Sequence, residues 1–293
     1  MARNHIFFHY VGPIVQDHHI TARTLGHTLT HLQGAIDRAA IDLKHGSLAK
    51  HARLKTEEYP LTDFIVGYPE EGGFILNLFN AGPLKLVDRM SQAVARAYQE
   101  AAKDAIPFTE SLVKQAERRT FAVQQGAQTP AELGLLAEFE DEERQRLRYA
   151  DRAINREIDQ VLAQLRVDRY EGSTLELQFA GDQTSPKYIF DAELSKKFHG
   201  VVAVRVLGDP VRLTVKIRAA DGRDASSHPV GKAIHVDSGR TFTLHFKSAD
   251  DFNSVVPFLK ANKRPEISII ACPILEYGVF DSKAGDMFFI AMG

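Results

Sequence analysis

The sequence predicts an α+β protein with an N-terminal β-α-β-β unit and a helical middle, followed by a mostly antiparallel β barrel or sandwich with one helix. Hydrophobic residues recur at helical spacing in several long segments before residue 166, and short strands dominate after Gly172. A hinge near residues 170–172 would divide the chain into an α+β and helical domain, residues 1–170, and a β-rich domain, residues 171–293.

The N-terminal unit is predicted from three apolar segments and the turns between them. Residues 5–11 alternate and end at Gly12-Pro13, which indicates a first strand. A helix is predicted over residues 20–44, because Leu25, Leu29, Leu32, Ile36, Ala39 and Leu43 share one face. Residues 62–68 and 73–79 then form a predicted hairpin around Pro69-Glu-Glu-Gly-Gly73.

The helical middle begins with two predicted helices, over residues 84–104 and 109–125. Thr129-Pro-Ala-Glu132 has the pattern of a capping box and predicts the start of a long charged helix that reaches Arg166. Its later apolar face consists of Ile154, Ile158, Val161 and Leu165, which suits packing in a helical bundle or a short coiled coil.

The β-rich region is predicted from a series of short apolar runs. A barrel and a sandwich fit this pattern equally, with one helix over residues 248–260 at one side or end. The predicted strands cover residues 175–179, 188–190, 201–207, 211–218, 233–236, 241–246, 267–271 and 287–291.

Composition limits the function classes. The chain has 293 residues and 44% hydrophobic residues, enough for one large or two ordinary domains. Lys and Arg total 36 against 38 Asp and Glu, so binding of nucleic acid would need a local basic patch. A single cysteine, Cys272, excludes an internal disulfide framework and indicates a reducing compartment, so we expect a cytoplasmic protein.

We expect no cofactor and no membrane partner. The sequence has neither a phosphate-binding glycine loop nor the Gly-x-Ser-x-Gly turn of many hydrolases. No apolar run approaches the roughly 20 residues that span a bilayer.

The first candidate site is a histidine pair on the first predicted helix. His27 and His31 are four residues apart and share a face with Arg38, which suits a metal or catalytic site. They lie opposite the leucine stripe, and the segment lacks the glutamate of a zinc-protease helix. A polar face against solvent or a neighbouring element is the favoured interpretation.

The second candidate is the loop over residues 220–228, between two predicted strands. Asp221, Arg223, Asp224 and His228 make it a candidate ligand or partner loop, although Asp221-Gly222 is also typical of an ordinary turn. It does not match a calcium-binding loop, because the alternating oxygen ligands and the final glutamate are missing.

The third candidate is a basic helical surface that could contact phosphates. Acidic residues interrupt it, so a solvated charged face is the favoured interpretation. The basic residues are Lys85, Arg89, Arg96 and Lys103 on one predicted helix and Arg118 and Arg119 on the next.

The opening segment also resembles a group of uncharacterised bacterial proteins of about this size. The resemblance rests on Gly12-Pro13, Ile20-Thr-Ala-Arg23 and residues 71–78, where the group has Gly-Ser-Phe in place of Gly72-Gly73-Phe74. It covers about the first 80 residues and carries no catalytic residue. It implies a bacterial or phage-related cytoplasmic protein, from mobile or defence-associated gene neighbourhoods.

Three functions follow as hypotheses. The leading one is a non-enzymatic binding or assembly protein that associates with itself or with a protein partner, through the helical middle and the β-rich region. A hydrolase or nuclease would instead need His27, His31, Arg38 and the 221–228 loop to converge. A nucleic-acid-binding module would use the basic helical surface.

Overall fold

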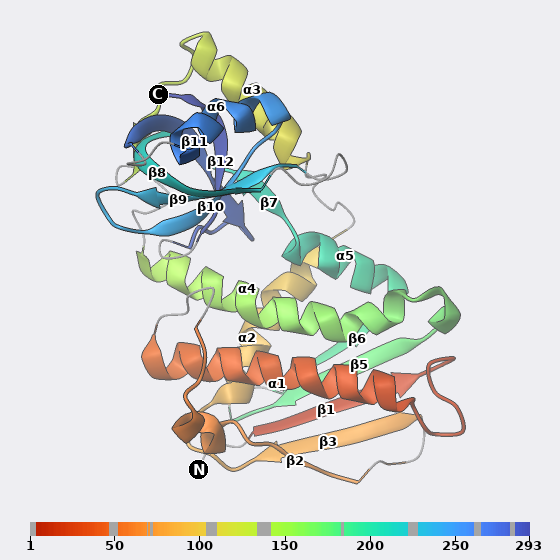
Figure 1. The fold of residues 1–293 in the computed structure, drawn as a ribbon. Helices are drawn as coiled ribbons and strands as arrows, with labels where there is room; N and C mark the ends of the chain where they lie inside the picture. The colour runs from red at the N-terminus through yellow and green to blue at the C-terminus, as the bar shows by residue number, and fades with distance from the viewer. Residues whose placement is uncertain are drawn as a thin grey trace. The chain divides into compact units, whose positions relative to one another are not determined.

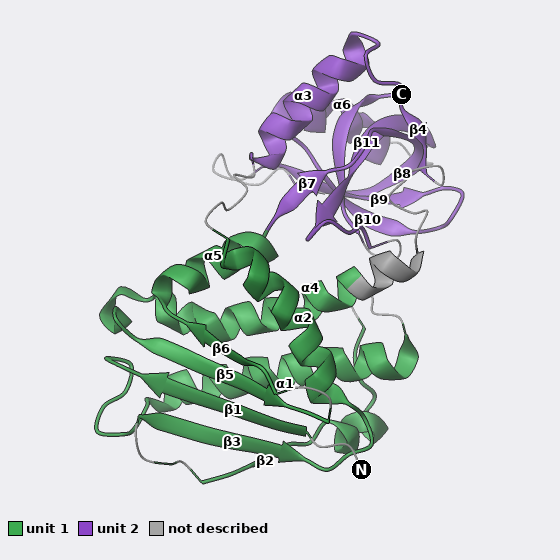
Figure 2. Cartoon of the chain, turned by 180° about the vertical axis from the view of Figure 1, so that it is seen from behind, with its two compact units in different colours: residues 1–48, 52–107, 146–203 green, residues 49–51, 108–145, 204–293 purple. Residues whose placement is uncertain are grey.

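The computed structural model describes residues 4–46, 52–68, 70, 73–103, 110–133, 142–182, 185–221, 228–260, 265–281 and 285–293. The chain forms two compact units, each assembled from separate segments (Figure 2). Unit 1 comprises residues 1–48, 52–107 and 146–203, and unit 2 comprises residues 49–51, 108–145 and 204–293.

Unit 1 is built on a five-stranded antiparallel sheet with the order β2-β3-β1-β5-β6. Its strands are β1 (Asn4–Val11), β2 (Ile65–Val66), β3 (Phe74–Asn80), β5 (Thr174–Ala180) and β6 (Lys187–Phe190). Central β1 alternates strictly: Ile6, Phe8 and Tyr10 are buried, and the side chains between them lie on the opposite face. One face of the sheet is therefore the core of unit 1.

Helices cover this buried face, and Figure 2 shows the strands in front with the helices behind them. They are α1 (Ala22–His45), α2 (Leu86–Ala101), α4 (Glu142–Leu162) and α5 (Ala192–Val202), with short 3₁₀ helices at Thr56–Leu61, Ala163–Arg166 and Asp168–Tyr170 (Figure 1). The predicted apolar face of α4 is confirmed as core, since Ile154, Ile158 and Val161 are fully buried. This face packs within unit 1, among the helices that cover the sheet.

The buried face of α1 contains only part of the predicted leucine stripe, since Leu32, Ile36 and Ala39 are buried. Thr28 is fully buried, whereas Leu43 is 40% exposed. The Thr28 hydroxyl lies 2.9 Å from the hydroxyl of Tyr10, which is itself fully buried. A buried tyrosine hydroxyl needs a hydrogen-bonding partner, so a threonine takes a core position that the predicted leucine stripe did not include. Burial also raises the pKa of Tyr10 to about 12.

A buried charge network joins three of the helices. Arg89 on α2 donates from Nε to Asp42 on α1, at 2.6 Å, and from Nη1 to Asp151 on α4, at 2.7 Å. All three side chains are at most 7% exposed. Arg96 reaches the second oxygen of Asp151 at 2.9 Å from a position that is half exposed. The network neutralises two carboxylates that would otherwise be buried without a partner.

Unit 2 contains a closed five-stranded barrel, so the barrel alternative is the one that forms. Its strands are β8 (Val211–Asp221), β9 (Val230–His235), β10 (Thr241–His245), β11 (Ile267–Glu276) and β12 (Met287–Met292). The order is β8-β9-β10-β12-β11, and β11 pairs back onto β8. Strand β8 can pair on both sides because it is long and has a bulge between Ile217 and Ala219.

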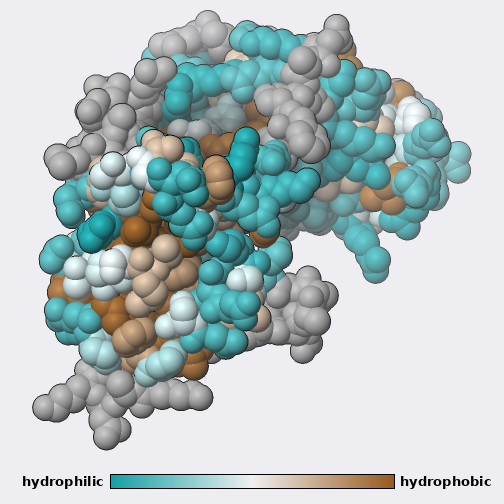
Figure 3. All heavy atoms as spheres, turned by 90° about the horizontal axis from the view of Figure 1, so that it is seen from above, coloured by the Kyte–Doolittle hydropathy of each residue, from teal (hydrophilic) through white to brown (hydrophobic). Residues whose placement is uncertain are grey.

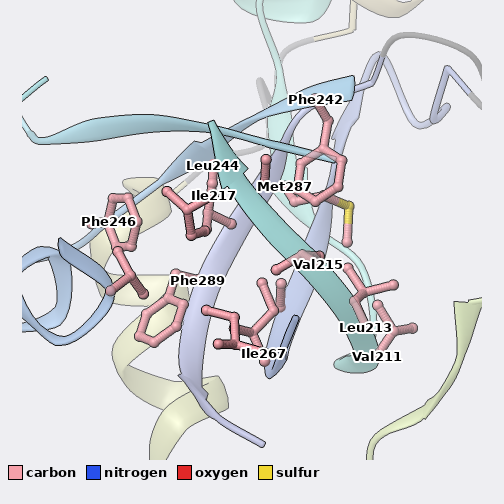
Figure 4. Close-up of a cluster of buried hydrophobic side chains, with 14 of the residues drawn as sticks. Val211, Leu213, Val215, Ile217, Phe242, Leu244, Phe246, Ile267, Met287 and Phe289 are labelled. Atoms are coloured by element: carbon pink, nitrogen blue, oxygen red, sulfur yellow. The ribbon is translucent and has the colours of Figure 1, made fainter. Parts of the chain in front are cut away.

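The barrel interior is filled by alternate side chains from all five strands. Figure 4 shows Val215, Leu244 and Phe289 among the inward-pointing residues. Helix α6 (Ala249–Lys260) adds Val255 and Phe252 to the same cluster. Among the barrel strands only β10 and β12 are parallel, and α6 connects the third strand to the fourth. This strand order, 1-2-3-5-4-1, is that of the OB-fold, a Greek-key barrel.

The capping box predicted at Thr129 does not start a helix. Ala131 and Glu132 form β4, which pairs in parallel with Val211 and Arg212 of β8. The Ala131 amide donates to the carbonyl of Pro210 at 3.1 Å. The segment covers the edge of β8 that β9 does not reach, and this pairing outweighs the local capping preference. Helix α4 begins later, at Glu142.

The strand predicted over residues 201–207 is also wrong in its first part. Helix α5 ends at Val202, and only β7 (Arg205–Leu207) is extended. The carboxylate of Asp191 accepts from the Leu194 amide at 2.7 Å and caps the helix. A strong N-cap and a buried Phe198 outweigh the strand preference of Val201 and Val202.

The two units do not divide at residue 170. Strands β5 and β6 follow that position but extend the sheet of unit 1, because β5 pairs with β1 from Thr174 to Ala180. Residues 108–145, predicted as part of the helical domain, belong to unit 2. Among the described residues, no helix is apolar over a stretch that could cross a bilayer.

Replacing Arg89 should destabilise unit 1 far more than replacing Arg96. Arg89→Met leaves Asp42 buried without its partner and leaves Asp151 with only the half-exposed Arg96, which should cost about 3–5 kcal/mol. Arg96→Met is the matched control, because Arg96 binds the same Asp151 from an exposed position and should cost less than about 1 kcal/mol. Urea unfolding followed by circular dichroism measures both, and equal losses would contradict the assigned role of Arg89.

Glu58 should make the stability of unit 1 depend on pH in the acidic range. Its carboxylate pairs with Lys44 at 2.6 Å and accepts from the Lys55 amide at 2.8 Å, and these bonds lower the pKa of Glu58 to about 2. Because the folded-state pKa is lowered, the ionised Glu58 stabilises the fold at pH values above the ordinary glutamate pKa. This stabilisation is lost as the pH falls from there toward 2.

The test compares wild type with Glu58→Gln by urea unfolding at several pH values. The difference in free energy of unfolding should be constant above about pH 5 and should shrink as the pH falls toward about 2. A difference that stays unchanged over this range would rule out the carboxylate as its source.

Candidate functional site: the open face of the barrel

The outer surface of the barrel has one covered side. Helix α3 (Leu112–Gln124) packs on β12 and β7, and its Ala116 is fully buried there. The outward residues of β11 and β12 lie in the same apolar cluster, which includes Cys272. The single cysteine is therefore a core residue with no exposed surface.

The outward residues of β8, β9 and β10 form the second side, which we call the open barrel face. Alternation turns one residue in two of each strand outward, while the residues between fill the barrel. These side chains are half-buried or exposed. They are Arg212, Thr214, Lys216, Arg218, Ala219 and Asp221 of β8, Val230, Lys232 and Ile234 of β9, and Thr241, Thr243 and His245 of β10.

Three cations lie close together on this face. Lys216 is opposite Ile234, and Lys232 is opposite Ala219 on one side and Thr243 on the other. Lys216 and Lys232 are thus diagonal neighbours, with Arg218 at the bulge between them and exposed. Diagonal neighbours in a sheet are about 7–8 Å apart, which places three positive charges within reach of one extended polyanion.

Three acidic residues lie near the face, and one of them, Asp221, is exposed at the end of β8 opposite Val230. Glu266 pairs with Lys216 at 3.0 Å, and both side chains remain about half exposed. Asp286 lies 3.9 Å from the Nε2 atom of His245. An exposed pair of this kind is worth little free energy, so Lys216 can exchange Glu266 for a phosphate.

Arg240, the residue before β10, cannot exchange its partners for a ligand in the way that Lys216 can. Its guanidinium lies over the ring of Phe280 at 4.8 Å and donates to the carbonyl of Gly285. Burial lowers the pKa of Arg240, and Asp281 and Asp286 act in the opposite direction. Arg240 therefore fixes the β11–β12 connection to the barrel.

Exposed hydrophobic side chains are few in the described part of unit 2. Phe121 on α3 is 65% exposed and Met292 is 39% exposed. In the view of Figure 3, hydrophobic residues gather mainly in one area, and most of the other described residues in view are hydrophilic. The open barrel face is thus suited to a charged ligand.

The histidine pair on α1 faces a neighbouring helix, α4. His31 Nδ1 lies 2.7 Å from a carboxylate oxygen of Glu157, and His27 Nε2 lies 2.9 Å from the carbonyl of Gln160. Arg38 donates instead to the carbonyl of Ala52 at 2.7 Å. Within the described ranges, no group of three or more His, Cys, Asp or Glu residues could hold a metal ion.

The candidate loop is described only at its two ends. Asp221 at the end of β8 and His228 before β9 are both exposed, while Arg223 and Asp224 lie outside the described residues. The loop begins where the open barrel face ends, because Asp221 pairs with Val230, which in turn pairs with His245.

The residues of the predicted basic helical surface are divided between the two units, and several of them are buried or paired. Arg89 is 6% exposed, which contradicts its predicted outward position, and Arg96 binds Asp151. Lys85 and Lys103 are exposed at the two ends of α2 in unit 1. In unit 2, Arg118 pairs with Glu110, and Arg119 pairs with Asp209 at 3.1 Å.

Sequence reasoning missed Lys216, Arg218 and Lys232 as a group. The alternation of residues 211–218 already turned Lys216 outward, but only the pairing of β8 with β9 brings Lys232 beside it. Comparison with protein-family models, curated proteins and solved structures finds no match for this chain. The likeness to the OB-fold therefore rests on strand order, on the parallel β10–β12 pair and on the place of α6.

Proposed function

We propose that this chain is a non-enzymatic binding protein whose barrel binds single-stranded nucleic acid on the open barrel face. The observation that carries the proposal is the cluster of Lys216, Arg218 and Lys232 on the side of the barrel that α3 leaves open. Phosphate contacts from Lys and Arg supply most of the affinity in sequence-independent binding.

The position of the cluster supports the proposal as much as its charge does. OB-fold barrels bind oligonucleotides and oligosaccharides on the face of their second and third strands, which here are β9 and β10. Fold alone assigns no function, and the three cations are what favour a polyanion over a neutral sugar. Thr241 and Thr243 add hydroxyl groups that can donate to phosphate oxygens.

The protein would discriminate only weakly among the bases of a bound nucleic acid. Single-stranded nucleic acid usually stacks its bases on exposed aromatic rings. On the open barrel face the His245 ring is already stacked on Phe288, at 6.4 Å between ring centres and 15° between planes. Binding therefore depends on the backbone of the nucleic acid, with little preference among base sequences.

Reversing two charges on the face should weaken binding. Lys216→Glu together with Lys232→Glu replaces attraction by repulsion, and the affinity for a labelled 20-nucleotide oligo-dT or oligo-U should fall at least about tenfold, or 1.4 kcal/mol. Fluorescence anisotropy measures the affinity. Lys114→Glu is the matched control, because Lys114 is exposed on α3, which covers the other side of the barrel. Equal losses in the two proteins would contradict the proposed site.

The affinity of the wild-type protein should also depend on salt. With about three phosphates neutralised, a plot of log affinity against log salt concentration should have a slope of about −2 for a single strand. The double variant should flatten this slope, and Lys114→Glu should leave it unchanged. A wild-type slope near zero would show that these cations do not bind phosphate.

A further inference from the structure

The sheet of unit 1 has one face that its helices leave open, and this face is rich in hydrophobic and aromatic side chains. We call it the open sheet face. It has His5, Phe7 and His9 on the central strand, with Ile75 and Phe79 beside them on β3. Ile65 on β2 is 75% exposed, Phe79 45% and Ile189 on β6 51%. These are high values for large hydrophobic residues that lie in the same sheet.

The strand register makes this surface continuous. Ile65, Phe79, His5 and Ala180 form one row across four strands. The His5 ring stacks on Phe79, with 4.5 Å between ring centres and 16° between planes. The pair of Val11 and Thr174, six residue pairs along the strands, closes the face at the other end, where Val11 is 43% exposed. Large apolar surfaces of this kind mark sites of protein association.

The polar side chains of the face have partners within the chain. His5 and Asn77 are joined at 2.8 Å, and Asn77 donates to Glu70 at 2.7 Å. Lys187 pairs with Glu176 at 2.8 Å. Covering these groups would leave few hydrogen bonds unmade, so the occupant needs no complementary charge.

We propose that the open sheet face is the interface of a homodimer, in which the sheets of two copies of this chain pack face to face. Lys187 and Glu176 neutralise each other on the face, so a second copy of the same face can cover its exposed apolar residues without a net charge between them, and a two-fold axis brings the same patch of each copy together. Two sheets pack in this way at about 10 Å through their apolar side chains.

The size of the face sets the strength of the dimer. Strands about 4.8 Å apart and up to eight residues long give a face on which two copies would bury about 1,000 Å² in total. Stable interfaces generally bury about 1,200–2,000 Å², so we expect a reversible dimer with a dissociation constant in the micromolar range. The proposal is independent of nucleic-acid binding, since the cations of the barrel lie in unit 2.

Sedimentation velocity of the full chain from about 1 to 300 µM tests the dimer, because this range spans a micromolar dissociation constant. The mass should rise from one chain to two, and it should do so equally at low and high salt, because the contact is apolar. A wild-type protein that stays monomeric at the highest concentration would overturn the proposal. So would an association that high salt abolishes.

Phe79→Glu should abolish the dimer, because a carboxylate would be buried in an apolar contact. Phe121→Glu is the matched control: the same substitution at an exposed phenylalanine on α3 of unit 2 should leave dimerisation unchanged. Ile65→Glu is the second variant in case Phe79→Glu fails to fold, since Ile65 is more exposed. Dimerisation of folded Phe79→Glu or Ile65→Glu with wild-type affinity would place the interface elsewhere.

Discussion

The architecture of unit 1 depends on one buried side chain, Arg89. The chain leaves this unit after α2 and returns only with α4, so α2 and α4 are far apart in sequence. Arg89 meets Asp42 on one side and Asp151 on the other, and it thereby holds α1, α2 and α4 over the buried face of the sheet. A buried ion pair of this geometry gives little net free energy but penalises every arrangement that leaves one charge unpaired. The Arg89 network therefore specifies how α4 packs in unit 1.

The segment between α2 and α4 contributes a helix and a strand to unit 2. It supplies α3, which covers β11 and β12, and β4, which covers the exposed edge of β8. What remains uncovered is the outer side of β8, β9 and β10, and this is where the three cations lie. The same segment that completes the barrel thus determines which of its sides a ligand can reach.

The two open faces of the molecule differ in chemistry. On the barrel, Lys216 and Lys232 lie beside threonines, and the acidic partner Glu266 is exposed and easily displaced. On the sheet, the polar groups are paired with one another, and the exposed area comes from residues such as Phe79 and Ile189. A charged ligand suits the first face and an apolar protein surface suits the second.

The sequence by itself determined the fold class and most of the elements, because hydrophobic periodicity is a local property. The strand that became β1, the helix that became α1 and the apolar face of α4 follow from residues within one element. Tertiary structure decided what depends on contacts across the chain. Thr129-Pro-Ala-Glu132 has the pattern of a helix start, yet Ala131 pairs with Val211. Thr28 is buried because Tyr10 needs a partner, and Lys216 meets Lys232 only because β8 bends to pair with β9. Register and pairing bring together residues that no local pattern relates, so both open faces became visible only in the folded chain.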